Sequence, residues 1–302
     1  MRTWTLLFTA ALVLLLGCRA EEEAAPAVPA RPAALEAPTA PPDSASQRLF
    51  EEVMAKARRA NLHERPLGEI MQAVGLEFLG TPYAAGTLDE PEQETLIASL
   101  TGFDCVLFIE TALALARGIA AQDYSYETFL GHIQDQRYRR GAMNGYCSRL
   151  HYFSDWIADN ERRGNVRNIT GEIGGEVLDK QLTFMSEHRD AYPRFAENDS
   201  LFQGIQAMED SLRTLTLYYV PQDRIGTVYD DLRAGDIIAT ATDIDGLDVT
   251  HSGLVYKGED GSTGFLHAST TGGVKVSPDL QDYVMNNKRQ IGIVVARPVA
   301  AR

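Results

Sequence analysis

The apolar stretch from residue 106 to residue 115 constrains the fold of this chain more than any other feature. Apart from Glu110 and Thr111, every residue in it is apolar, so the stretch has no polar face to turn toward water. Such a pattern predicts a helix buried inside a domain. Asp104 is a good N-cap, so we expect this helix to begin at Cys105. The rest of the domain must then cover the helix on all sides.

The expected position of Cys105 in the first turn of this helix offers two chemical advantages. The unpaired amides and the positive end of the helix dipole lower a thiol pKa. The same amides can bind an oxyanion. A small buried cysteine that only packs is the alternative. The pattern alone leaves a nucleophile and a packing residue equally open.

Apolar periodicity predicts helices in the first half of the chain and strands in the last part. Helices are expected near 49–54, after Pro66, and at 126–138, 148–157 with Ser148 as its cap, 177–188 and 201–212. Strands are expected at 95–100, 215–220, 236–240, 251–256, 264–268, 274–277 and 291–297. Short connections favour antiparallel pairing. We therefore expect an α+β fold in which the buried helix packs on an antiparallel sheet, with extra N-terminal and inserted helices.

The N-terminus has the pattern of a lipoprotein leader. Arg2 precedes an apolar run from Leu6 to Leu16, and Gly17 and Cys18 follow it. This run is shorter than the roughly 20 apolar residues of a membrane-spanning helix, and it has the form of a processed segment. A plain signal peptide or a short anchor is the alternative. We predict a signal peptide over 1–17 and acyl chains on Cys18 that hold the protein on a membrane.

The segment after Cys18 is predicted to be a tether. Residues 19–45 are mostly Ala, Pro and Glu, with too few large apolar side chains to fold. At about 3.1 Å per residue they reach at most roughly 80 Å, which is far enough to meet a cell wall. Residues 46–302 contain no repeat or second linker, so we expect one domain there. Because Arg19 stands where an Asp commonly signals inner-membrane retention, we expect an outer-membrane lipoprotein facing the periplasm.

Charge and cysteine content narrow the function classes. The formal net charge is −14, and loss of Arg2 with the leader makes it 27 − 42 = −15. This acidic balance argues against binding to nucleic acid or to anionic lipid. Apart from Cys18, the chain contains Cys105 and Cys147. An oxidising compartment favours a disulfide, but their surroundings differ so much that we expect two free thiols.

A cysteine nucleophile needs a base, and two histidines in the strand-rich part are candidates. His251 follows Cys105 by 146 residues, and His267 follows His251 by 16. The order cysteine, histidine, polar residue is that of a nucleophile, its base and an orienting group. Spacing alone is weak evidence for such a triad.

Several segments, in the same order, resemble the papain-like NlpC-type cell-wall cysteine hydrolases, and more narrowly their N-acetylmuramoyl-L-alanine amidase-like branch. These segments are Gly80-Thr81-Pro82-Tyr83, Phe103-Asp104-Cys105, Ser148 to Ile157, Gly235-Asp236-Ile237-Ile238, Gly246 to Gly253, and Leu266-His267-Ala268-Ser269. The resemblance covers nearly all of the folded part. It implies a papain-like core with Cys105 as nucleophile, His251 as general base and acid, and His267 as the residue that orients His251.

The resemblance also implies a substrate, which is a peptidoglycan-derived muropeptide. The bond would be the amide between the lactyl group of N-acetylmuramic acid and L-alanine. Commoner members of the wider superfamily cut within the stem peptide, usually between D-glutamate and a diamino acid. Those enzymes have a small residue after the cysteine, where this chain has Val106. This difference weakens the inference that this chain has the substrate pocket of those endopeptidases. We expect no metal or other cofactor, and a monomer.

Five further residues are predicted to contact substrate, namely Tyr83, Asp104, Arg149, His151 and Asp248. Tyr83 either lines the cleft or packs with its hydroxyl hydrogen-bonded. Arg149 is unfavourable at a helix start, so it needs a carboxylate. That carboxylate belongs either to the stem peptide or to Glu110, and the internal pair is favoured. Asp248 is a turn residue or part of the cleft wall.

Two rival functions use the same residues differently. A zinc amidase would take ligands from His151, His251, His267 and Asp155 or Asp248. His151 and Asp155 are four residues apart on a predicted helix, but two ligands do not make a site, and a structural pair is favoured. The second rival is a non-catalytic wall-binding lipoprotein in which Cys105 only packs.

Overall fold

The structure is a computed structural model that describes residues 39–40 and 44–300. The predicted signal peptide, the lipidated Cys18 and most of the predicted tether lie outside these residues. Within the described part, no helix has the length and apolar character needed to span a membrane.

An eight-stranded antiparallel sheet forms the centre of the described domain. Its order is β2-β3-β8-β4-β5-β6-β7, and β1 also pairs with β8. The strands are β1 Val166–Asn168, β2 Glu176–Leu178, β3 Leu217–Pro221, β4 Ile237–Thr242, β5 Val249–Lys257, β6 Thr263–Ser269, β7 Gly273–Ser277 and β8 Gln290–Pro298. Because β4 to β7 follow one another through short connections, each pairs with its neighbour in sequence. The antiparallel sheet expected from the sequence is confirmed.

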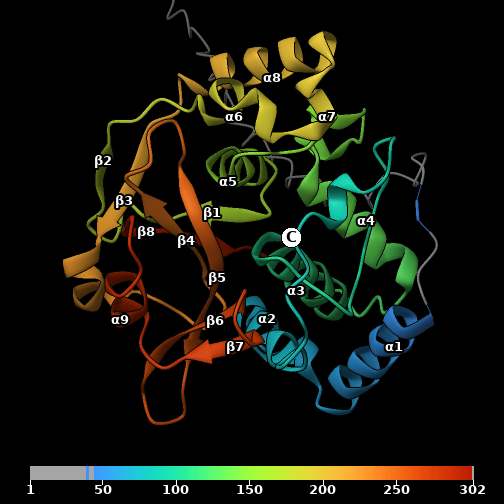
Figure 1. Ribbon diagram of the computed structural model, residues 1–302. Helices are drawn as coiled ribbons and strands as arrows, with labels where there is room; N and C mark the ends of the chain where they lie inside the picture. Colours follow the sequence, from blue (N-terminus) through green and yellow to red (C-terminus); the bar gives the residue numbers. More distant parts are fainter. Residues whose placement is uncertain (1–38, 41–43, 301–302) are drawn as a thin grey trace, which may run out of the picture.

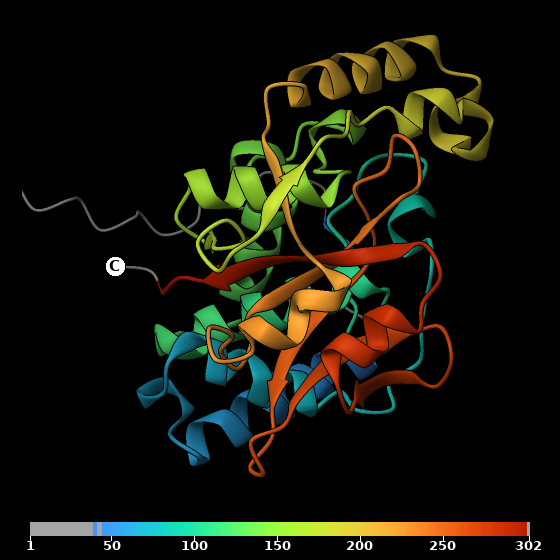
Figure 2. The same cartoon turned by 90° about the vertical axis from the view of Figure 1, so that its left-hand side faces the viewer.

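Helices cover both faces of this sheet. They are α1 Ser44–Arg59, α2 Leu67–Leu76, α3 Cys105–Ala120, α4 Tyr126–Arg137, α5 Phe153–Arg162, α6 Phe184–Glu187, α7 Pro193–Ala196, α8 Asp199–Leu212 and α9 Leu280–Met285. Figure 1 shows α2 and α3 on one side of the sheet and α9 on the other, and a separate apolar cluster fills each side. Helix α8 lies at one end of the molecule and α1 at the other (Figures 1 and 2).

Helix α3 is the buried helix that the apolar stretch predicts. Asp104 is its N-cap, and the Oδ1 atom of Asp104 accepts a hydrogen bond of 2.7 Å from the amide of Leu107. The helix begins at Cys105, and it packs against α1, α2 and α4 and against strands β5 and β6. Its apolar residues are covered all round as a consequence. The α+β class and the placement of this helix on the sheet agree with expectation.

Three local predictions are wrong. Residues 177–188 do not form a helix, because Glu176–Leu178 pairs with β3 and only Phe184–Glu187 is helical. Ser148 does not cap α5, since its hydroxyl bonds the carbonyl of Gly145 and the amide of Asn144, and α5 starts at Phe153. Residues 95–100 contain an isolated bridge instead of a strand.

Candidate active site

The Cys105 thiol lies where strands β5 and β6 separate. The ladder between these strands ends at the pair Leu254–Leu266, so the first residues of β5 are unpaired on that side. The amide and the hydroxyl of Ser252 interact with the thiolate of Cys105 at this point and act to lower its pKa. The Ser252 hydroxyl is buried and has no hydrogen-bond partner among the described residues, so it is free to donate to a thiolate at this point. The amide and the hydroxyl of Ser252 are therefore two hydrogen-bond donors beside the thiol.

His251 and His267 form a hydrogen-bonded pair next to this point. The Nε2 atom of His251 lies 2.8 Å from the Nδ1 atom of His267. A side chain at Gly253, the residue between Ser252 and the paired part of β5, would collide with His267, because a Cβ atom at that position would lie 2.8 Å from the His267 Cβ. The glycine thus lets the two rings meet. Tyr283 packs on both rings, and burial together with the charge of Cys105 raises its pKa, so Cys105, His251 and His267 lie in one region.

Tyr83 and Asp104 lie beside the same thiol. The segment around Tyr83 runs alongside Phe103, with Phe103 donating to the carbonyl of Pro82 and Ala84 donating to the carbonyl of Phe103. Burial raises the pKa of Tyr83 to about 12, and the charges of Cys105 and Asp104 add to this shift. Tyr83 therefore lies close enough to Cys105 to respond to its charge, and Asp104 is the helix cap.

Burial reverses the expected direction of the thiol pKa. It raises the pKa of Cys105 to about 11, the nearby Asp104 carboxylate adds to the rise, and the donors of Ser252 only partly offset it. Burial also lowers the pKa of His251 to about 4 and that of His267 to about 3. The resting pair is consequently a neutral thiol and a neutral imidazole. The lowered thiol pKa expected at the start of the helix is not found, because desolvation outweighs the helix amides and dipole.

Arg149 has internal partners that differ from the predicted one. Its Nε and Nη2 atoms donate to both carboxylate oxygens of Glu94 at 2.9 and 2.7 Å, and Nη1 donates to Asp89 at 2.8 Å. Glu110 instead pairs with Arg137. The guanidinium of Arg149 is buried and occupied by these groups, so it holds the loop before α3 against the segment before α5.

His151 and Asp248 also make structural contacts. The Nε2 atom of His151 lies 2.9 Å from the carbonyl of Tyr146, and the ring packs against the Tyr146 ring. The buried Asp248 accepts from the amide of Ser154 at 2.7 Å, which caps the first turn of α5 from a distant part of the chain. Asp155 pairs with Arg139. The predicted His151–Asp155 pair is therefore wrong.

These contacts occupy three of the proposed zinc ligands, namely His151, Asp155 and Asp248. In the described part of the chain, no group of three or more histidine, cysteine or acidic side chains is arranged to hold a metal ion. Cys105 and Cys147 are both free thiols, as expected. Cys147 lies at the short helix Tyr146–Ser148, where its sulfur is 3.7 Å from the carbonyl of Leu201.

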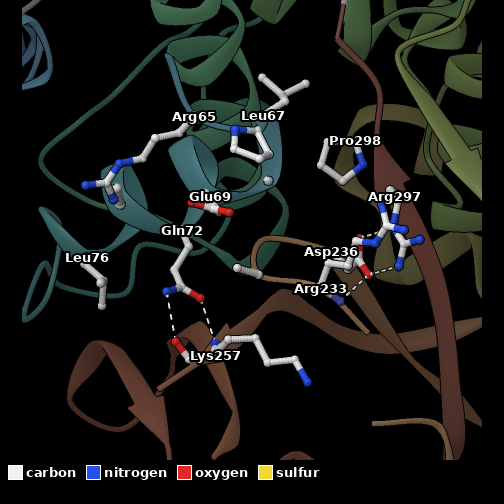
Figure 3. A pocket seen from close by; sticks show the side chains of 14 residues that line it. Arg65, Leu67, Glu69, Gln72, Leu76, Arg233, Asp236, Lys257, Arg297 and Pro298 are labelled. Carbon is white, nitrogen blue, oxygen red and sulfur yellow. Dashed lines mark hydrogen bonds and ion pairs between the residues drawn. The ribbon is translucent and has the colours of Figure 1, made fainter. Parts of the chain in front are cut away.

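A cavity of about 670 Å³ lies at the far end of the strands, between the start of α2 and the ends of β5 and β8. Gln72 closes one side of it by bonding both the amide and the carbonyl of Lys257, at 2.8 and 3.2 Å (Figure 3). Arg297 closes the other side through two bonds to Asp236. Its lining includes none of the predicted site residues, so it is separate from the Cys105 region.

Comparison with known proteins decides the family. The model of the N-acetylmuramoyl-L-alanine amidase-like family, also called AmiA-like, matches residues 73–293, which is well over half of the chain. The chain belongs to this amidase-like family. The matched range contains Tyr83, Cys105, His251 and His267 together with most of the sheet. No curated protein matches the chain significantly.

Solved structures agree with membership of the amidase-like family. An N-acetylmuramoyl-L-alanine amidase from Bacteroides uniformis is 31% identical, with a TM-score of 0.72, covering 77% of this chain and 98% of that one. A Bacteroides fragilis structure whose name assigns it provisionally as a xylanase is 33% identical, with a TM-score of 0.68 and coverage of 74% and 98%. A Legionella pneumophila protein at 20% identity and TM-score 0.60 covers 85% and 98% and shares the fold.

Sequence reasoning missed three residues of the candidate site. Ser252 follows His251, and strand alternation could have placed its side chain on the face toward α3. Ser277, at the end of β7, lies 3.1 Å from the Nε2 atom of His267. Tyr283 of α9 packs with its ring centre 4.8 Å from that of His267 and 6.0 Å from that of His251. No local pattern marks these last two, because pairing and packing bring them in.

Acid should destabilise this amidase-like domain through its buried histidines. Burial lowers the pKa of four of them, to about 4 for His132, His151 and His251 and about 3 for His267. These histidines take up protons near pH 6.5 in the unfolded state but not in the folded state. Their contribution to the free energy of unfolding is therefore complete above pH 6.5 and is lost progressively below it. Each group can contribute at most about 1.4 kcal/mol per pH unit.

The expected result is a Tm that falls steadily between pH 6.5 and pH 4.5. The substitution His151→Gln should make this slope shallower, because the amide can still donate to the Tyr146 carbonyl and does not titrate. His188→Gln, at an exposed position, is the matched control. Thermal unfolding by circular dichroism measures the effect. A Tm that is independent of pH over this range would contradict the prediction.

Proposed function

We propose that this chain is a papain-like cysteine amidase of the NlpC type that hydrolyses the N-acetylmuramoyl-L-alanine bond of peptidoglycan fragments. The observation that carries the proposal is the 2.8 Å contact between His251 and His267 beside the Ser252 donors that face the Cys105 thiol. Family membership and the name of the Bacteroides uniformis structure support the amide and wall substrate classes.

The proposed reaction has two steps, formation of a thioester and its hydrolysis, and His251 returns each proton that it takes up. His251 takes the thiol proton, and the sulfur of Cys105 attacks the lactyl carbonyl. The backbone amide of Cys105, at the start of α3, donates to the oxyanion. His251 then returns the proton to the nitrogen of L-alanine, and the C–N bond breaks. Water, deprotonated by His251, hydrolyses the thioester, which releases the lactyl carboxylate and restores the thiol.

The electrostatics of the cleft suit a transient ion pair. Burial disfavours a thiolate alone and an imidazolium alone, but proton transfer creates both charges together, so their attraction offsets part of the cost. The amide and hydroxyl of Ser252 stabilise the sulfur anion, and the ring of His267 accepts from the charged His251. Tyr83 is also near the thiol, because the charge of Cys105 contributes to the raised pKa of Tyr83.

The location of this activity is part of the same proposal. Acyl chains on Cys18 would hold the protein on the outer membrane, and the tether of residues 18–45 would let a single domain over 46–302 reach wall fragments in the periplasm. The acidic net charge of −14 disfavours adhesion to anionic polymers, so recognition would depend on the shape of the cleft. We propose that the protein acts as a monomer.

Mass spectrometry of defined muropeptides tests the bond that is cut. An amidase should release a free stem peptide with an L-alanine N-terminus and a glycan that ends in a lactyl carboxylate. The stem peptide without sugar is the matched control substrate, and it should remain intact. Cleavage of that control between D-glutamate and the diamino acid would show an endopeptidase instead. Binding without cleavage would show a wall-binding protein.

A further inference from the structure

A second hydrogen bond continues from the histidine pair to β7. The Nδ1 atom of His267 faces His251, and its Nε2 atom lies 3.1 Å from the hydroxyl of Ser277. In the β6–β7 ladder Ser277 is paired with Phe265, two residues before His267, so both side chains lie on the same face of the sheet. The result is a continuous line of contacts from His251 through His267 to Ser277.

Aromatic packing fixes the plane of the His267 ring but not the identity of its edge atoms. The Phe265 ring stacks on it at 4.8 Å and 13°, and the Tyr283 ring meets it edge-on at 4.8 Å. A flip of the imidazole by half a turn keeps the same plane but exchanges nitrogen for carbon on both edges. Hydrogen bonds alone distinguish the two orientations, and Ser277 supplies the one on the side away from His251.

The tautomers of the two rings are linked. A neutral imidazole has one N–H, so either His251 donates through Nε2 to His267 or His267 donates through Nδ1 to His251. Only the first arrangement leaves the Nδ1 atom of His251 without a proton and able to act as a base. When His251 becomes an imidazolium, its Nε2 must donate. His267 then has to carry its own proton on Nε2, where the oxygen of Ser277 can accept it.

We propose that Ser277 is a positioning residue, whose hydroxyl holds the orientation and the Nε2-protonated tautomer of His267 and so keeps Nδ1 of His251 free to accept the thiol proton. The role in turnover depends on the proposed function. The hydroxyl can accept from His267 and still donate outward, because Ser277 lines an open cavity of about 320 Å³ next to α9. His267 is only 1% exposed, so the fold itself supplies the partner of its Nε2 atom, which is Ser277.

The test combines turnover with a direct reading of the tautomer. For Ser277→Ala we expect kcat/KM to fall about 10- to 100-fold with little change in KM, less than the whole ~10²–10⁴-fold contribution of general acid–base catalysis. Nitrogen-15 NMR of labelled histidine should show Nε2 protonated in His267 of the wild type and a mixture in the variant. Ser277→Thr keeps the hydroxyl and should restore both properties.

The matched control is Ser211→Ala in α8, whose hydroxyl donates only to the carbonyl of Met208 at 2.6 Å. This variant should leave kcat/KM and the His267 signals unchanged. A Ser277→Ala variant with the kcat/KM and the His267 tautomer of the wild type would overturn the proposal. Equal losses in the alanine and threonine variants, with the His267 tautomer unchanged, would overturn it too, by showing a packing role. If the wild type cleaves no muropeptide, the NMR measurement still decides the role of Ser277 separately from the proposed function.

Discussion

Replacing Cys105 with alanine is expected to abolish muropeptide hydrolysis, with a fall in kcat of about 10⁴-fold or more. No other group in the proposed mechanism can form the acyl intermediate. The fold should persist, because the helix cap depends on Asp104 and not on the thiol. Product formation followed by chromatography measures the loss, and an unchanged circular dichroism spectrum shows that the domain is intact.

Cys147→Ala is the control for this experiment. Cys147 is the other free thiol of the described domain, and it lies at the Tyr146–Ser148 turn, where its sulfur contacts α8 instead of the histidine pair. Its variant should keep full activity. Iodoacetamide should inactivate the wild type and the Cys147→Ala variant alike, and EDTA should have no effect. Activity in Cys105→Ala that is lost with EDTA would support the zinc amidase instead.

Strong local patterns explain why much of the fold could be predicted. The stretch from 106 to 115 is apolar on every side, and its cap precedes it directly, so the information for α3 is local. The strands from β3 to β8 also have alternating or continuous apolar patterns between clear turn residues. The order of the sheet is less accessible, because β8 inserts between β3 and β4 by long-range pairing.

The wrong predictions share a physical cause, which is that contacts distant in sequence decide the local structure. The first turn of α5 is capped by Asp248, from nearly a hundred residues away, so no nearby residue marks the start of the helix. Residues 176–178 become a strand because β3 offers them a free edge. Helix propensity is too weak to resist such pairing.

The candidate site also combines residues that local sequence patterns reveal with residues that only distant contacts bring in. Cys105 and its cap are evident from the sequence, and His251 and His267 are suggested by motif order and spacing. The surroundings that set their chemistry are not evident, since Ser252, Ser277 and Tyr283 reach the site by strand pairing and by the packing of α9. Burial, which reverses the expected thiol pKa, depends on the whole domain.

A buried ion pair that holds α3 against α4 should dominate the stability of the region that carries the thiol. The Nε atom of Arg137 donates to Glu110 at 2.7 Å, and both side chains are only 2% exposed. The guanidinium also donates to the carbonyl of Ile97 at 2.6 Å. Removing one partner leaves the other charge buried without compensation. We therefore expect Glu110→Leu to cost about 3–5 kcal/mol of unfolding free energy.

The double variant Glu110→Leu with Arg137→Met should recover most of that loss, because apolar groups of similar size avoid the desolvation of both charges. The exposed pair Arg213–Asp210 gives the control, and Asp210→Asn should cost at most about 1 kcal/mol. Urea unfolding followed by fluorescence measures each value. A double variant as unstable as Glu110→Leu alone would mean that packing against α4, and not an unpaired charge, causes the loss. The orientation of the helix that presents Cys105 would then depend on shape alone.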